Sequence, residues 1–93
     1  MTAEVEEFWA AMPPKALHPR RVPILEAFRC IGEPLSPVMV VDVLEGEVTM
    51  WEAAAHLDAL VRLGVLRRRG RDPQAPSLRE ERFDLFYSLV LGD

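Results

Sequence analysis

Apolar residues recur at intervals of three or four positions in several segments, the spacing of one helix face. The first such segment, residues 4–12, carries glutamates in its first turn, where the helix dipole favours acids. Pro13 and Pro14 end it, because neither donates a backbone hydrogen bond and each restricts the preceding residue. We therefore predict an amphipathic helix and a Pro-Pro linker over residues 1–14, with the apolar positions Val5, Phe8, Trp9 and Met12.

Three further helices are predicted from apolar stripes bounded by capping residues and glycines. The second helix has the apolar stripe Ile24, Leu25, Phe28 and Ile31. Gly32 ends that helix, and Ser36 can cap a third one over residues 38–44. Thr49 can cap a fourth over residues 50–63. On this last helix we expect the inward side to consist of Ala53, Leu57 and Leu60.

The helical spacing of apolar residues ends at Gly64. Residues 65–69 are predicted to form a strand, residues 70–77 a loop rich in glycine and proline, and residues 78–86 a second extended segment. The expected fold is thus mainly α with a small β-hairpin. Residues 15–93 would form one domain with a C-terminal dimerisation segment, because a chain of 93 residues fits a single core.

Composition and local motifs indicate where in the cell the protein functions. No apolar run approaches the roughly 20 residues that cross a bilayer, so no membrane span is expected. The N-terminus carries no secretory leader pattern, and the one cysteine cannot form an internal disulfide, which together favour a cytoplasmic protein. We interpret this residue, Cys30, as a buried and inert thiol on the apolar side of its helix.

The charge is unevenly distributed along a chain whose net charge is −4. Residues 1–61 hold four basic and ten acidic side chains, whereas residues 62–82 hold seven arginines against three acids. An arginine cluster on the predicted hairpin is suited to bind phosphates, because guanidinium groups form paired hydrogen bonds with them. The alternative is a solvated strand edge that is kept from pairing by its charge.

Several local motifs follow one another in a characteristic order. The most specific is His56-Leu57, then Leu60, then the run Leu63-Gly64-Val65-Leu66. The other stretches are HPRRVPILEAF at 18–28, LSPVMVVDVLEG at 35–46 and ERFDLFYSL at 81–89. Together with the order of elements, these motifs resemble ArsR-like winged-helix transcriptional regulators. The resemblance implies a winged helix with a helix-turn-helix core, an extra N-terminal helix and a two-stranded wing. It further implies a homodimer that binds double-stranded DNA.

In such a regulator the helix at residues 49–63 enters the major groove and the wing lies along the phosphate backbone. The candidate DNA contacts are then Thr49, Met50, Trp51, Ala54, Ala55 and Arg62 on the helix and Arg67, Arg68, Arg69 and Arg71 on the wing. Relatives usually carry more polar residues on this helix, and here Glu52 and Asp58 would repel phosphates. The alternative function is therefore a winged-helix protein–protein interaction module that has lost sequence-specific DNA reading.

Trp51 has two interpretations, an anchor at an interface or a side chain folded over Pro37 or Val40 in the core. The candidate dimer contacts outside the helix-turn-helix core are Phe8, Trp9, Phe86, Tyr87 and Leu89. These groups could instead close over their own subunit. His18 and His56 share no metal-ligand spacing, and no motif for catalysis or for a cofactor is present, so we expect neither an enzyme nor a metal protein.

Overall fold

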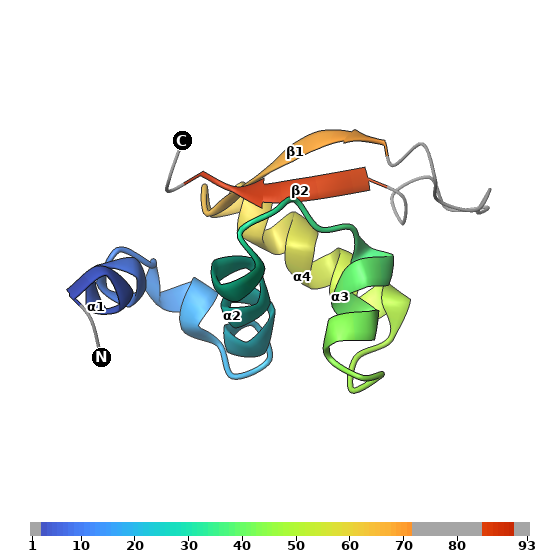
Figure 1. The fold of residues 1–93 in the computed structure, drawn as a ribbon, viewed down its shortest axis with the longest axis horizontal. Helices are drawn as coiled ribbons and strands as arrows, with labels where there is room; N and C mark the ends of the chain where they lie inside the picture. Colours follow the sequence, from blue (N-terminus) through green and yellow to red (C-terminus); the bar gives the residue numbers. More distant parts are fainter. Residues whose placement is uncertain (1–2, 72–84, 91–93) are drawn as a thin grey trace.

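The computed structural model describes residues 3–71 and 85–90. Helices surround one core on one side of a two-stranded antiparallel sheet (Figure 1). The elements are α1 (Ala3–Ala10), the 3₁₀ helix η1 (Pro14–Leu17), α2 (Val22–Ile31), α3 (Pro37–Val43), α4 (Met50–Arg62), β1 (Leu66–Arg71) and β2 (Leu85–Leu89). This arrangement confirms the prediction of a mainly helical fold with a small β-hairpin.

The starts of α3 and α4 and the end of α2 lie at the residues that the sequence indicates, whereas α1 ends at Ala10 and not, as predicted, at Pro13. The Ser36 hydroxyl accepts a hydrogen bond from the Met39 amide (3.4 Å) at the start of α3. At the start of α4, Thr49 and Glu52 form a reciprocal capping box, with the Glu52 amide donating to the Thr49 hydroxyl at 3.1 Å. Gly32 closes α2 in the left-handed conformation (φ 71°), and such a backbone favours glycine.

The core is built mainly from α2, α4 and the sheet. On α4, Ala53, Leu57 and Leu60 are fully buried, as predicted from the helical spacing. The remaining core residues are Met12, Ala16, Ile24, Leu25, Ala27, Phe28, Leu35, Val40, Val48, Val65, Leu66 and Tyr87. Because α3 also packs on α4, the short turn between these two helices fixes the position of the α4 N-terminus.

The sheet differs from the prediction in its second strand. The expected extended segment covers residues 78–86, but β2 is Leu85–Leu89, and residues 78–84 lie outside the described residues. Register explains the position of β2, because Leu66 pairs with Leu89 and Arg68 pairs with Tyr87. The first strand continues past the expected residues 65–69 to Arg71, with a register shift between Arg68 and Arg71.

A backbone bridge joins β2 to the segment between α2 and α3. The Leu35 amide donates to the Tyr87 carbonyl at 2.9 Å, and the Tyr87 amide donates to the Leu35 carbonyl at 2.8 Å. Thus β2 lies between β1 and the α2–α3 connection (Figure 1). The residues expected to form a dimerisation segment are therefore strand residues at the centre of this pairing.

The N-terminal segment packs on the same core. Pro14 starts η1, which the sequence did not predict, and Ala16 within it is fully buried. Phe8 and Trp9 of α1 meet edge to face, with ring centroids 4.9 Å apart, and both are half-buried against the core. Apolar contacts thus attach α1 and η1 to the other helices of the described residues.

Candidate nucleic-acid interface

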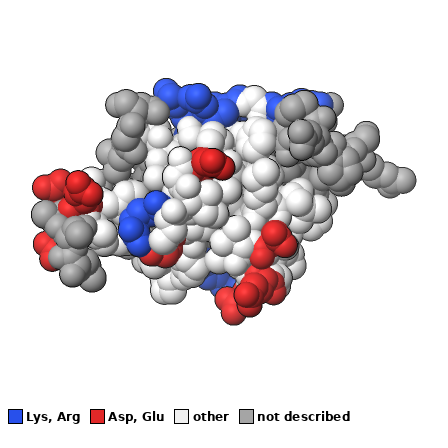
Figure 2. Space-filling view, in the orientation of Figure 1, with Lys and Arg blue, Asp and Glu red and all other residues white. Residues whose placement is uncertain are grey.

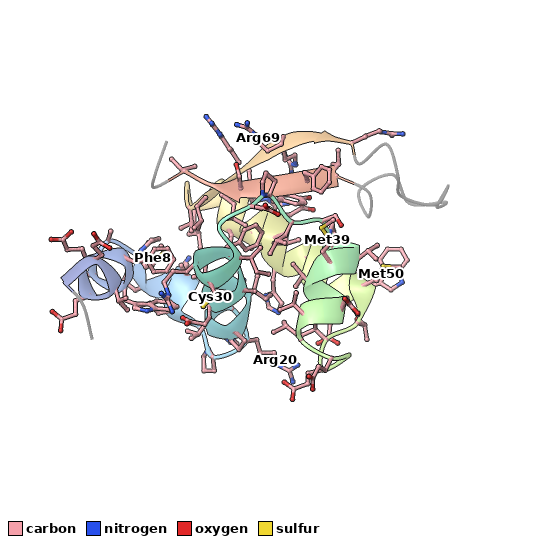
Figure 3. The ribbon with its side chains drawn as sticks, viewed as in Figure 1. Phe8, Arg20, Cys30, Met39, Met50 and Arg69 are labelled. Carbon is pink, nitrogen blue, oxygen red and sulfur yellow. The ribbon has the colours of Figure 1, made fainter. Side chains whose placement is uncertain are left out.

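Four arginines of β1, Arg67, Arg68, Arg69 and Arg71, are exposed. Leu66 is buried, and every later residue of the strand, through Arg71, is exposed. Successive side chains on a strand face opposite ways. Leu66 and Arg68 face α4, so Arg67 and Arg69 point away from the helices, as Figure 3 shows for Arg69. Basic side chains accordingly gather along the sheet at the top of Figure 2.

Arg68 is engaged in a network with α4. Its guanidinium donates to the Asp58 carboxylate at 3.1 Å, and the Tyr87 hydroxyl donates to the same Asp58 oxygen at 2.9 Å. The hydrogen bond to Asp58 raises the pKa of Arg68. Burial, and then the hydrogen bond to Asp58, raise the pKa of Tyr87 to about 12. We call these three residues the sheet-side network. Arg67, Arg69 and Arg71 are the other predicted wing contacts on β1, all three exposed, and we call these three the basic edge.

The exposed side of α4 is a narrow stripe of Trp51, Ala55 and Arg62. Trp51 is 53% exposed, so the interpretation that it folds over the core is wrong. Met50 is half-buried, and Thr49 is exposed but uses its hydroxyl in the capping box. Ala54 is fully buried, which corrects its assignment as a DNA contact: it precedes Leu57 by one helical turn and faces the core with it.

Both acids of α4 are paired with arginines from other elements. Glu52 lies 3.1 Å from the Arg20 guanidinium, and Asp58 belongs to the sheet-side network. Hydrogen bonding from the Thr49 backbone amide lowers the pKa of Glu52, which keeps this carboxylate ionised. Repulsion of phosphates by the two acids is therefore weaker than the sequence suggests, because each negative charge has a neighbouring positive one.

A second group of polar residues connects α4 to the N-terminus of α2. The Arg21 guanidinium donates to His56 Nδ1 at 3.1 Å, and the His18 and His56 rings lie 6.4 Å apart. Burial, and then the charge of Arg21, lower the pKa of His56. The sequence did not predict this proximity, because the two histidines are far apart in the chain. No group of three or more potential metal ligands occurs within residues 3–71 and 85–90.

The candidate dimer residues contact their own subunit. Tyr87 is fully buried, so its assignment as a dimer contact is wrong: the side chain fills the space between the sheet and α4. Phe8, Trp9 and Leu89 are half-buried against the same core, and Phe86 is half-buried. The alternative that these groups close over their own subunit therefore holds for Tyr87 and describes the contacts of Phe8, Trp9 and Leu89.

The expectation that Cys30 is a buried thiol is wrong. Its thiol is exposed and donates a hydrogen bond to Glu26 at 3.3 Å, one helical turn earlier. This hydrogen bond raises the pKa of the Cys30 thiol. The sequence places Cys30 near the apolar stripe of α2, but the structure turns it toward the boundary with α3, where the core ends.

Comparison of the chain with protein-family models, with curated proteins and with solved structures finds no match. Within the part of the chain that the structure describes, no helix combines the length and apolar character needed to span a bilayer.

Proposed function

We propose that the chain is a winged-helix domain that binds duplex DNA and regulates transcription. Two packed helices, α3 and α4, joined by a short turn and followed by a β-hairpin, support the fold assignment. The single observation that carries the functional proposal is the exposed basic edge next to an α4 helix whose two acids are both paired with arginines.

In this proposal, the basic edge binds phosphates and fixes the position of the domain on the duplex. Phosphate contacts supply most of the affinity but carry no sequence information. The stripe of α4, with Thr49 and Met50 beside it, faces the major groove, which is wide enough for a helix. Because Ala55 cannot form hydrogen bonds with base edges and Arg62 is the one charged donor of the stripe, we expect weak preference among DNA sequences.

The test is binding of a fluorescein-labelled duplex of mixed sequence at several salt concentrations. The variant R67A/R69A removes two outward-facing guanidinium groups and keeps Arg68 in its network. We expect weaker binding and a salt slope reduced by about 2, because each phosphate contact contributes roughly 0.9. The matched control K15A/R29A removes the same charge at a distance from the sheet and should retain the parent slope. Equal binding by R67A/R69A and the parent, or no binding by the parent at low salt, would refute the proposal.

A homodimer is part of the proposal, since two copies of α4 could then contact half-sites one helical turn apart. The remaining exposed parts of Phe8, Trp9, Phe86 and Leu89 are the available apolar contacts on α1 and β2. Sedimentation velocity at high micromolar concentration tests this part separately. A monomer under those conditions would remove the homodimer from the proposal.

One observation favours a second candidate, a protein-interaction module. Trp51 is 53% exposed, and Val38 and Met39 of the neighbouring α3 are 37% and 36% exposed. Exposed aromatic and methionine side chains are frequent at protein interfaces. Duplex binding by the parent at low salt separates the two functions. An interaction module does not bind, whereas under the DNA proposal the parent binds and W51A changes preference among duplexes.

A further inference from the structure

A shallow apolar groove runs between α2 and α3. The α2 side is formed by Pro23, Ala27 and Ile31, and the α3 side by Val43 and Leu44. A second hollow shares Pro23 and Leu44 with the first and continues the groove toward the turn after α3. None of the residues that line either hollow is among the proposed DNA contacts, although Arg20 of the second hollow pairs with Glu52 of α4.

The walls of this groove leave apolar surface in contact with water. Ile31 is 41% exposed and Val43 is 42% exposed, and they face the groove from opposite sides. Covering such side chains with another apolar group is favourable in proportion to the area removed from water. From Pro23 to Ile31 the groove follows α2 for about 12 Å, at roughly 1.5 Å per residue, which matches two turns of a bound helix.

The charged residues at the groove indicate which sign of charge a bound partner would carry. Arg20 and Glu26 also line the hollows, but they are paired with Glu52 and Arg29 respectively. Glu47 lines the second hollow, and Glu45 lies in the same turn. The ion pairs among the described residues join Arg20 to Glu52, Arg29 to Glu26 and Arg68 to Asp58, and none includes Glu45 or Glu47. Acidic side chains gather over this turn at the lower right of Figure 2. The uncompensated charge at this end of the groove is therefore negative.

We propose that the groove between α2 and α3 binds a basic amphipathic helix of a partner protein. The partner's apolar residues, spaced three and four positions apart, would pack between Ile31 and Val43. Lysines or arginines beside that apolar stripe would lie against Glu45 and Glu47. The domain would then contact DNA with β1 and α4 and a second protein with the opposite side of α3.

The experiment uses two synthetic helical peptides that share one leucine stripe and differ only in having lysines or glutamates beside it. Fluorescence anisotropy of the labelled peptides measures their binding to the whole chain. We expect the lysine peptide to bind and the glutamate peptide to bind at least about tenfold more weakly, because attraction to Glu45 and Glu47 is replaced by repulsion. I31S/V43S should weaken binding of the lysine peptide by a further factor of about ten.

Charge variants distinguish the groove from general attraction to an acidic protein. E45K/E47K changes the charge beside the groove, and E6K/E7K makes the same change in charge on α1. Only E45K/E47K should weaken binding of the lysine peptide strongly. Circular dichroism and thermal unfolding establish that each variant retains the parent fold.

Cys30 reports on occupancy of the groove without any substitution, because it lines the groove and is the one cysteine of the chain. Saturating lysine peptide should slow alkylation of this thiol severalfold. The proposal is overturned if alkylation is unchanged at saturation, if the lysine and glutamate peptides bind equally, or if E6K/E7K and E45K/E47K weaken binding alike.

Discussion

The two flanks of α4 each hold an acid against an arginine, but they do so in different environments. On the sheet side, the Asp58 side chain is 18% exposed and also accepts a hydrogen bond from the buried Tyr87. On the α2 side, the Glu52 side chain is 40% exposed and its partner Arg20 is 60% exposed. Burial determines how much each pair contributes to stability. Water screens the exposed pair, whereas a group on the buried side that loses its partner destabilises the fold.

The flanks also respond to opposite ends of the pH range. The sheet side contains Tyr87, whose raised pKa favours the protonated phenol in the folded state. The α2 side contains Glu52 and His56, whose lowered pKa values favour the deprotonated forms. Alkali should therefore weaken the attachment of the sheet to α4, and acid should weaken the attachment of α2.

The largest expected effect is on the sheet side. D58A removes the acceptor of the Tyr87 hydroxyl and the partner of Arg68. We expect it to lower the free energy of unfolding by about 2 kcal/mol, since the buried hydroxyl loses its hydrogen bond. Urea denaturation followed by circular dichroism measures the loss. D42A, at an exposed acid of α3, serves as the control and should change stability by less than about 0.5 kcal/mol. Equal stability of the two variants would show that the sheet-side network contributes nothing.

The second prediction concerns alkaline pH. The pKa of Tyr87 rises from an ordinary value of 10.0 to about 12 on folding, so its contribution is complete below pH 10 and is lost as pH rises toward 12. The free energy of unfolding should decline across this window. Y87F cannot ionise and should lack this part of the decline. Parallel stability curves for Y87F and the parent between pH 10 and 12 would contradict the assignment.

The third prediction concerns acidic pH, which should reduce stability through the α2 side of α4. The pKa of His56 is lowered from 6.5, chiefly by burial, so its neutral form stabilises the fold above pH 6.5. That contribution is lost as pH falls through the lower folded-state pKa. H56Q should reduce the loss of stability just below pH 6.5, while leaving the decline between pH 10 and 12 intact. An NMR titration in which His56 has a folded-state pKa above 6.5 would refute this prediction.

The smallest effect is expected for the exposed pair. R20A leaves Glu52 with its capping hydrogen bonds and removes only a partner at the surface. Its loss of stability should be less than half that of D58A and should vanish in high salt, because exposed ion pairs are screened. Urea denaturation at low and at high salt measures this loss of stability. A loss as large as that of D58A at both salt concentrations would show that the two flanks are equivalent.

Much of the helical structure followed from local signals. Ser36, Thr49 and Gly32 act within one turn of their own position, so the sequence was sufficient to predict the helix boundaries that they set. The inward side of α4 was likewise predicted from spacing, except at Ala54, because a small residue beside the apolar stripe suits either the core or the surface.

Apart from the burial of Ala54 and the exposure of Cys30, the errors concern contacts between distant parts of the chain. The position of β2 depends on its pairing with Leu35 and with β1, and no local signal specifies that register. Tyr87 was expected at a dimer interface because its apolar character alone does not identify which surface covers it. The contacts of His18 with His56 and of Asp58 with Tyr87 likewise join residues that only the tertiary fold brings together.

The bridge between Leu35 and Tyr87 has a consequence for the folding pathway. It joins residues 52 positions apart, whereas the helix caps act across three positions. Ordering a long intervening chain is costly before its contacts form, so we expect α2, α3 and α4 to associate first and β2 to dock late. In stopped-flow experiments, Y87F should then accelerate unfolding and leave the refolding rate nearly unchanged. If Y87F instead slows refolding by the factor expected for faster unfolding, β2 is part of the folding nucleus.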